Sequence, residues 1–291
     1  MRDKIQAIPL WQGDITVAPL TGGRTNANFL VQDDTGKYVV RFGHDIPQHH
    51  VLRFNELAAS RAAHLAGLSP AVVYVGEGIS VLPYIDSYTL QEKDVAQPAY
   101  LARIVDLMKS CHHDIAPHLR GPVLAFWVFH VVQDYVATLQ AGNSPYTPLL
   151  AEFLETSARL QKAVGKVELV FCHNDWMAAN ILDDGARLWL IDWDYAGFNS
   201  PLFDLGGLAA NNELDRAQER EMLTLYYGQA PDAPLLRRYY AMKCAALLRE
   251  TLWSMVAELT SDLDVDYVEY TAQNLARLRK ALQAYERDED V

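Results

Sequence analysis

The sequence predicts an α+β fold with two lobes. A small β-rich lobe is expected over residues 1–86 and a larger helical lobe over residues 87–291. The first third of the chain holds short segments rich in β-branched and aromatic residues, separated by glycine-bearing turns, which is the pattern of strands and hairpins. From about residue 91 the apolar residues recur with the period of amphipathic helices. Two such lobes leave a cleft between them, and small ligands commonly bind in such clefts.

The first lobe is expected to contain a sheet and one helix. Its strand-like segments are residues 15–20, 27–32, 38–42, 71–75 and 79–84. A helix fits residues 51–66, because Gly67 and then Pro70 supply the usual stop signals. A short hinge over residues 83–87 would join this lobe to the next.

The second lobe is expected to be mostly helical, with one hairpin in its middle. The helical segments are residues 98–113, 123–139, 148–164, 202–211, 216–227, 233–258 and 265–286. Between the third and fourth of these, short apolar runs flank Asp183-Asp184-Gly185, which is a turn signal. A hairpin there would fold the following residues back beside its own start.

Length and composition favour one large or two medium globular domains. The chain has 291 residues, of which 50% are hydrophobic and 21% charged, so it can bury a core. Its net charge of −12 argues against nucleic acid as a partner, because phosphate backbones are bound by clustered Lys and Arg. Three widely spaced cysteines indicate free thiols in a reducing compartment. No leader and no membrane-length apolar run is evident, so we expect a cytoplasmic protein without a membrane partner.

One segment carries a catalytic pattern. His173, Asp175 and Asn180 form His-x-Asp-x-x-x-x-Asn, and Asp192 follows twelve residues after the Asn. Phosphoryl-transfer enzymes of the kinase type use one Asp to accept the proton of an attacking hydroxyl, and an Asn and a second Asp to hold magnesium against the phosphates. The predicted hairpin would place Asp192 beside Asn180. Asp and Asn are also common in surface turns, but three residues at this spacing favour the kinase interpretation.

Two parts of the small lobe could bind the ends of a nucleotide. Gly22 and Gly23 lie in a turn between strands, where backbone N–H groups can approach phosphate oxygens; a plain hairpin turn is the alternative. In the hinge, the carbonyl group of Pro83 and the N–H group of Ile85 could read the edge of adenine.

A charged pair is expected deeper in the same cleft. Arg41 stands where protein kinases place the strand Lys that pairs with the phosphates. Glu56, fifteen residues on, lies on the following helix, where the partner acid would be. An Arg offers a planar fork and is not equivalent to Lys, so Arg41 argues against a protein kinase proper. The alternative for Glu56 is a solvated helix residue.

Several segments together resemble the choline/ethanolamine kinases, which belong to the wider group similar to aminoglycoside phosphotransferases. The matching segments are residues 20–29, 40–41, 173–175, 191–197 and 203–205, and the match runs in register from about residue 18 to 213. The resemblance implies a two-lobed protein-kinase-like fold, with a nucleotide-binding lobe first and a lobe carrying the catalytic loop and substrate site second. It implies ATP- and Mg²⁺-dependent phosphorylation of a small alcohol.

The resemblance also implies a role for individual residues. Asp175 would be the catalytic base, and Asn180 and Asp192 the magnesium ligands. Asp204 would tie the catalytic loop to the following helix, unless it is only the cap of that helix. The nucleotide would be bound by a set drawn from the small lobe: Gly22, Gly23, Asn26, Arg41, Glu56, Pro83 and Ile85.

The acceptor is expected to be a small alcohol with a cationic nitrogen. Choline is the first candidate and ethanolamine the second. Its candidate ligands are Trp176, Asp194, Tyr195, Glu250 and Trp253. Aromatic faces attract a quaternary ammonium, although core packing is the more common fate of a Trp. The family tends to place an acid where this chain has Asn211, and a Trp where it has Glu250. Whether Glu250 or Glu213 replaces that acid is left open.

Other functions stay open at this level. One alternative is a kinase for thiamine, an aminosugar or an aminoglycoside; the last would be expected to bring an acidic C-terminal tail, such as Glu286 and residues 288–290, to the cleft. Another is a pseudokinase that binds nucleotide without turnover, against which the intact catalytic set argues. A homodimer is also considered. The paired histidines at 49–50 and 112–113 are interpreted as surface or core residues, because neighbours in sequence do not converge on one metal.

Overall fold

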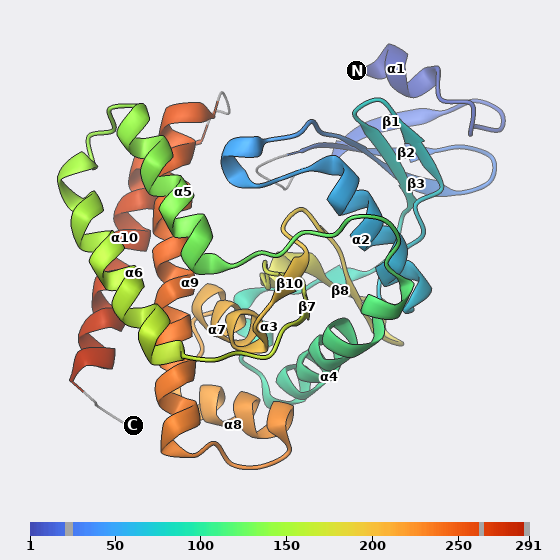
Figure 1. Cartoon of the computed structure of the whole chain (residues 1–291). Coiled ribbons are helices and arrows are strands. Elements are labelled where there is room, and N and C mark those ends of the chain that lie inside the picture. The colour runs from blue at the N-terminus through green and yellow to red at the C-terminus, as the bar shows by residue number, and fades with distance from the viewer. Residues whose placement is uncertain (21–25, 262–264, 288–291) are drawn as a thin grey trace.

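The computed structural model describes residues 1–20, 26–261 and 265–287. It confirms the predicted fold class: a small lobe built on a sheet lies beside a larger helical lobe (Figure 1). The predicted division at residues 86 and 87 falls in the extended segment after the last strand of the small sheet. None of the helices in the described part of the chain is long and apolar enough to cross a membrane.

The small lobe is a five-stranded antiparallel sheet in the order β1-β2-β3-β5-β4. Its elements are α1 (Arg2–Gln6), β1 (Thr16–Leu20), β2 (Ala27–Gln32), β3 (Lys37–Phe42), η1 (Pro47–His49), α2 (Arg53–Leu65), β4 (Tyr74–Gly76) and β5 (Ile79–Pro83). A separate core of Ile5, Ile8, Val31, Val40 and Val81 holds α1 against the sheet. The sequence did not predict α1, which is only five residues long. The strand predicted over residues 71–75 was partly wrong, because regular pairing with β5 begins only at residue 74.

The large lobe is mainly helical. Its elements are β6 (Tyr88–Thr89), α3 (Glu92–Val95), α4 (Pro98–Asp114), η2 (Ala116–His118), α5 (Val128–Ala141), η3 (Thr147–Leu149), α6 (Leu150–Val164), β7 (Val170–Cys172), η4 (Ala178–Asn180), β8 (Ile181–Asp183), β9 (Leu188–Leu190), β10 (Gly197–Asn199), α7 (Pro201–Asn211), α8 (Arg216–Tyr227), α9 (Ala233–Thr260) and α10 (Tyr267–Glu286). The predicted helices correspond to α4–α10, with ends shifted by a few residues.

One helix boundary was wrong for a tertiary reason. The helix predicted from residue 123 begins at Val128, because the preceding residues run extended beside β10. The Phe126 N–H donates to the carbonyl of Phe198 at 2.9 Å, and the Phe198 N–H donates to Leu124 at 2.9 Å. These partners lie some seventy residues away in sequence, so no local pattern could reveal them.

Helix α9 is the central element of the large lobe. It is 28 residues long and buries side chains around most of its circumference, so it has no single apolar stripe. Figure 1 shows α5, α6, α7 and α10 arranged around it. The Asp232 side chain caps its first turn by accepting from the Leu235 N–H at 2.9 Å.

The predicted catalytic hairpin forms as β8 and β9. Ile181 pairs with Leu190, and Asp183 pairs with Leu188. The Ile191 N–H then donates to the carbonyl of Asn180 at 3.0 Å, so the chain entering the second acidic loop starts beside Asn180. The fold therefore brings the two ends of the catalytic pattern together.

Two neighbouring glycines on α7 should respond oppositely to an added methyl group. A Cβ at Gly206 would lie 3.0 Å from the Cα of Lys243 on α9, whereas a Cβ at Gly207 would have no atom within 4 Å. We expect Gly206→Ala to lower the free energy of unfolding by about 1–2 kcal/mol, because two backbones must separate. Gly207→Ala should raise it by up to about 1 kcal/mol through helix propensity. Urea denaturation measures both, and equal effects would contradict the close α7–α9 packing.

Candidate active site

Asp204 anchors the loop that leads into Asp175. Its Oδ2 accepts from the backbone N–H of His173 at 3.0 Å, and its Oδ1 accepts from the N–H of Asn174 at 2.9 Å. Asn174 has a left-handed φ of 65°, an unusual conformation for a residue other than glycine. Asp204 is 1% exposed and lies in the first turn of α7, but Ser200 is the residue that caps that helix. The contacts therefore correspond to a loop anchor rather than to a simple helix cap.

His112, on α4, supports this anchor. Its Nε2 lies 3.0 Å from Asp204 Oδ2, and its Nδ1 lies 2.7 Å from the hydroxyl of Tyr226. Burial acts to raise the pKa of Asp204, but the hydrogen bond and charge of His112 outweigh it and hold that pKa below its ordinary value. Cys172 Sγ lies 3.8 Å from the same imidazole. Asp204 already binds two backbone N–H groups and His112. The buried cluster of His112, Cys172 and Asp204 is therefore explained without a metal ion.

Asp175 and Asn180 are bonded to each other. The Asn180 Nδ2 donates to the Asp175 carbonyl at 2.9 Å and to its Oδ2 at 3.2 Å. Burial raises the pKa of Asp175 to about 7, while nearby Arg249 acts in the opposite direction. A carboxylate with this pKa is a better proton acceptor than an exposed Asp at neutral pH. Asn180 uses its amino group here, which leaves its side-chain oxygen for another ligand.

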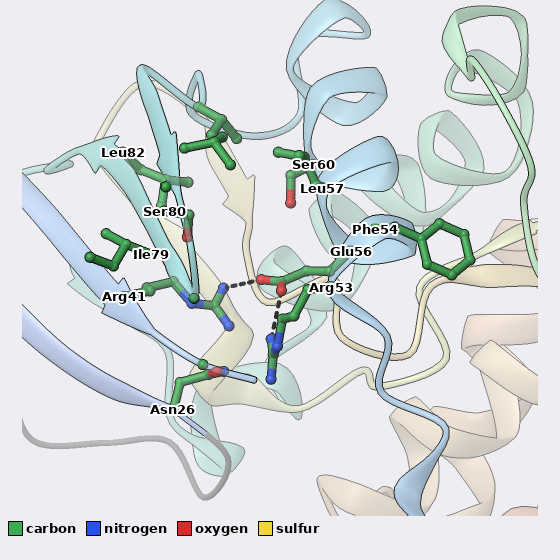
Figure 2. A pocket seen from close by; sticks show the side chains of 15 residues that line it. Asn26, Arg41, Arg53, Phe54, Glu56, Leu57, Ser60, Ile79, Ser80 and Leu82 are labelled. Atoms are coloured by element: carbon green, nitrogen blue, oxygen red, sulfur yellow. Dashed lines mark hydrogen bonds and ion pairs between the residues drawn. The ribbon is translucent and has the colours of Figure 1, made fainter. Parts of the chain in front are cut away.

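A network of two arginines and three carboxylates joins the lobes. Arg41, on β3, lies 3.1 Å from Asp192, 3.3 Å from Asp194 and 3.2 Å from Glu56. Arg53, the first residue of α2, lies 2.5 Å from Glu56 and 2.8 Å from Asp194. Figure 2 shows the guanidinium groups of Arg41 and Arg53 both reaching the carboxylate of Glu56. The expected Arg41–Glu56 pair therefore forms within a larger cluster.

Asp194 lies in this network and not on the acceptor side, where the sequence analysis expected it. It is 2% exposed, and its Oδ2 also accepts from Asn26 Nδ2 at 3.2 Å. The expectation that it binds the acceptor is corrected on these contacts, because its oxygens are directed to the small lobe. Sequence analysis missed Arg53; its spacing of three residues from Glu56 on one helix was the available signal.

The network borders a cavity of about 200 Å³ between α2 and the small sheet. Figure 2 shows Arg41, Glu56, Ser60, Ser80 and Leu82 around it. Pro83 ends β5 directly after Leu82, and the carbonyl group of Ile85 accepts from Ser87 Oγ at 3.1 Å. The expected binding of adenine by Pro83 and Ile85 stays a prediction. Gly22 and Gly23 lie outside the described residues.

The acceptor side differs from the expected aromatic box. Trp176 is 1% exposed and packs near His173 in the core, so its ring has no open face. The Nε1 of Trp253 donates to the hydroxyl of Tyr195 at 2.8 Å, and both residues are buried. Arg249, which the sequence analysis did not single out, covers the Tyr195 ring, with its Cζ 4.4 Å from the ring centroid.

Glu250 lies beside Asp175, at a cavity of about 20 Å³. The lining also includes Asn211, Gly207 and Ala246. Both oxygens of Glu250 have partners: Oε2 accepts from Arg249 at 2.9 Å and Oε1 accepts from the hydroxyl of Tyr270 at 2.6 Å. Glu213, the other acid considered, lines a separate cavity of about 510 Å³ between α7, α8, α9 and α10. The geometry thus brings Glu250, rather than Glu213, to Asp175.

The donor set at the two acidic loops suits a hard cation. Asp192 offers a carboxylate that is 27% exposed, and Asn180 offers the side-chain oxygen left free by its bonds to Asp175. Carboxylate and amide oxygens are the ligands that Mg²⁺ takes in proteins. Asp192 has a left-handed φ of 67°, an unusual conformation for a residue other than glycine.

The chain is similar over most of its length to known proteins of one family. The family model for choline/ethanolamine kinase matches residues 17–239. The chain is 23% identical to the protein LicA of Haemophilus influenzae, over 90% of this chain and 78% of that protein. It is 24% identical to human ethanolamine kinase 2, over 90% of this chain and 75% of that protein. A solved choline/ethanolamine kinase family protein from Mesorhizobium loti is 28% identical, with a TM-score of 0.77 and coverage of 97% and 93%.

The loop anchor can be tested with two adjacent histidines on α4. We expect His112→Ala to lower the free energy of unfolding by about 1–3 kcal/mol, because it leaves the buried Asp204 carboxylate without its side-chain hydrogen-bond partner. His113→Ala is the control: its side chain is exposed, and a change within about 0.5 kcal/mol is expected. Chemical denaturation gives both values. A His112 variant as stable as the His113 variant would remove the anchor role.

Proposed function

The chain belongs to the choline/ethanolamine kinase family and is a small-molecule kinase, and from this premise we propose that it transfers the γ-phosphoryl group of ATP to the hydroxyl of a small amino alcohol. The observation that carries the proposal is the bonded pair Asp175 and Asn180, together with the β8–β9 hairpin that returns the chain to Asn180 directly before Asp192. This is the residue set that phosphoryl transfer requires. We retain a cytoplasmic location as part of the proposal, and a homodimer as a prediction.

Asp175 is proposed to act as the base. Its carboxylate would bind the hydroxyl of the acceptor and take its proton as the oxygen attacks phosphorus. Asn180 fixes the orientation of that carboxylate through its hydrogen bond to Oδ2, and it also holds the backbone carbonyl of Asp175. Most of the remaining catalysis would come from holding the two substrates in line and from neutralising phosphate charge.

Asn180 and Asp192 are the residues that would hold Mg²⁺. The ion, when bound, supplies positive charge against the phosphate oxygens. Asp192 is paired with Arg41 in this structure. Arg41 has two further carboxylate partners, Glu56 and Asp194, so it stays anchored in the cleft when Asp192 turns to another cation.

The acceptor side supports a small primary amine such as ethanolamine over choline. A trimethylammonium group relies on open aromatic faces, but Trp253 and Tyr195 are buried and Arg249 already covers the Tyr195 ring. A primary ammonium instead donates three N–H bonds, and Glu250 and Asn211 provide oxygen acceptors at the cavity beside Asp175. The small cavity volume, about 20 Å³, also favours a small acceptor over an aminosugar or aminoglycoside. Of the tail proposed for an aminoglycoside, residues 288–290 lie outside the described part, and Glu286 pairs with Arg159.

The choice of acceptor can be tested through Arg249. We expect the wild-type protein to have a higher kcat/KM for ethanolamine than for choline, and a neutral alcohol of similar size to be a poor substrate. Arg249→Leu exposes the Tyr195 ring and releases one Glu250 oxygen, so it should shift the choline-to-ethanolamine ratio toward choline by about tenfold. A coupled assay of ADP release with each alcohol measures the ratio.

The comparison uses a ratio because loss of a buried arginine also affects stability. The melting temperature and the KM for ATP serve as controls on folding. Wild-type preference for choline would contradict the primary-amine assignment, and a ratio unchanged by Arg249→Leu would show that Arg249 does not set specificity. Turnover of neutral alcohols at the same rate as ethanolamine and choline would contradict the proposal that the acceptor is cationic.

Two acidic variants should separate the base from the metal site. Asp175→Asn should keep Mg²⁺-dependent ATP binding and lower kcat by roughly 100-fold or more, because the shape remains while the proton acceptor is lost. Asp192→Ala should abolish the dependence of ATP binding on Mg²⁺, since it removes the one full negative charge assigned to the ion. Calorimetric titration of ATP, with and without Mg²⁺, and steady-state kinetics distinguish the two losses. Near wild-type turnover in the Asn variant would exclude Asp175 as the base.

A further inference from the structure

Arg53 is held at the mouth of the nucleotide cleft by contacts to both lobes. Its backbone N–H donates to Asp45 Oδ1 at 2.8 Å, and its Nε donates to the carbonyl of His44 at 2.9 Å. Its Nη1 donates to Glu56 and to Asp194. The side chain is thus fixed at two of its atoms, Nε and Nη1, and it is 20% exposed.

The remaining nitrogen, Nη2, is buried without a hydrogen-bond partner among the residues that the structure describes. A buried N–H donor of a charged group is costly to leave unpaired, which points to a ligand in the functional state. Gly43 lies against this nitrogen and against Asn26: a Cβ there would come closest to Asn26 Oδ1 and would be 3.0 Å from Cζ and 3.1 Å from Nη2 of Arg53. The absence of a side chain at position 43 therefore allows the guanidinium to lie where it does.

Arg53 and Arg41 converge on one point. Both contact the same oxygen, Asp194 Oδ1, at 2.8 and 3.3 Å. Arg41 pairs with Asn28 across the sheet, so it shares a face with Asn28 and with Gly43 two residues on. That face borders the cavity in which Figure 2 draws Asn26, Arg41 and Arg53 together.

The charges in this cluster also leave room for an added anion with its metal ion. The two arginines face three carboxylates: Glu56, Asp192 and Asp194. One of these, Asp192, is the proposed metal ligand. A bound cation would therefore neutralise the Asp192 carboxylate in place of Arg41. Two guanidinium groups would then face two carboxylates with donors to spare. An Arg fork is suited to phosphate oxygens.

We propose that Arg53 is a second phosphate-binding residue, which together with Arg41 binds the β- and γ-phosphates of the nucleotide. The assignment rests on the proposed ATP-dependent function. The terminal phosphates are chosen because Arg53 shares Asp194 with Arg41 and lies beside the loop of Asp192, the residue that would hold the magnesium ion. The alternative is that Arg53 only neutralises Glu56 and Asp194.

A ladder of nucleotides, in which the number of phosphate groups decreases step by step, separates phosphate binding by Arg53 from a role in neutralising Glu56 and Asp194 only. Calorimetric titrations with Mg²⁺ are made for ATP, ADP, AMP and adenosine on the wild-type protein and on Arg53→Gln. We expect the Kd for ATP and ADP to rise by about 10- to 100-fold, because a charge-assisted bond to phosphate is lost. The Kd for AMP and adenosine should stay within about twofold. The control is Arg61→Gln, an exposed arginine two turns along the same helix, which should leave the whole ladder unchanged.

A second variant leaves Arg53 in place. Gly43→Ala pushes a methyl group against both Asn26 Oδ1 and the Arg53 guanidinium and should raise the Kd for ATP by about 3- to 10-fold, again without affecting adenosine. This variant decides the question if Arg53→Gln does not fold. An equal loss across the ladder, or a lower melting temperature with unchanged Kd for ATP, would overturn the phosphate role. A wild-type protein that binds no ATP at all would instead overturn the proposed function on which it rests.

Discussion

The buried carboxylate of Asp194 is the contact on which the relation between the two lobes depends. It belongs to the large lobe by sequence, but its partners come from the small lobe. Asn26 directly precedes β2, Arg41 lies on β3 and Arg53 begins α2. An ionised carboxylate that is 2% exposed is very costly unless it is paired, so these partners cannot leave together. Asp194 follows Asp192 by two residues, and the same contacts that neutralise it hold the proposed metal ligand at the mouth of the cleft.

A second buried carboxylate, Asp204, fixes the loop that carries the proposed base. It binds the backbone of His173 and Asn174 just before the proposed base. Asn174 is held in a left-handed conformation that costs of order 1–3 kcal/mol and persists only where the surroundings impose it. The loop that carries Asp175 is therefore positioned by one acid and the loop that carries Asp192 by another, and the β8–β9 hairpin joins them. Rigid placement of this kind is what phosphoryl transfer asks of a protein.

The sequence predicted the elements whose signals are local. The strand over residues 27–32 and the helix over residues 216–227 were predicted to the residue, since alternation, caps and stop signals lie within the segments. The start of α5 could not be predicted, because its preceding residues bond to β10. The site shows the same division. The catalytic spacing could be read from the chain, whereas Arg53 was missed because its partner Asp194 is 141 residues away.

The acceptor side shows why residue types alone do not define a recognition site. Tyr195, Glu250 and Trp253 are the residues from which a cation box could be built, and the fold does place Glu250 beside Asp175 and bond Trp253 to Tyr195. Yet the guanidinium of Arg249 lies 4.4 Å from the centroid of the Tyr195 ring and hydrogen-bonds Glu250, so the protein's own cation occupies both the aromatic face and one carboxylate oxygen. What is left for a ligand is hydrogen-bonding capacity rather than an open aromatic surface. That difference comes from a single neighbour on α9, and it favours an acceptor that can donate hydrogen bonds from its nitrogen.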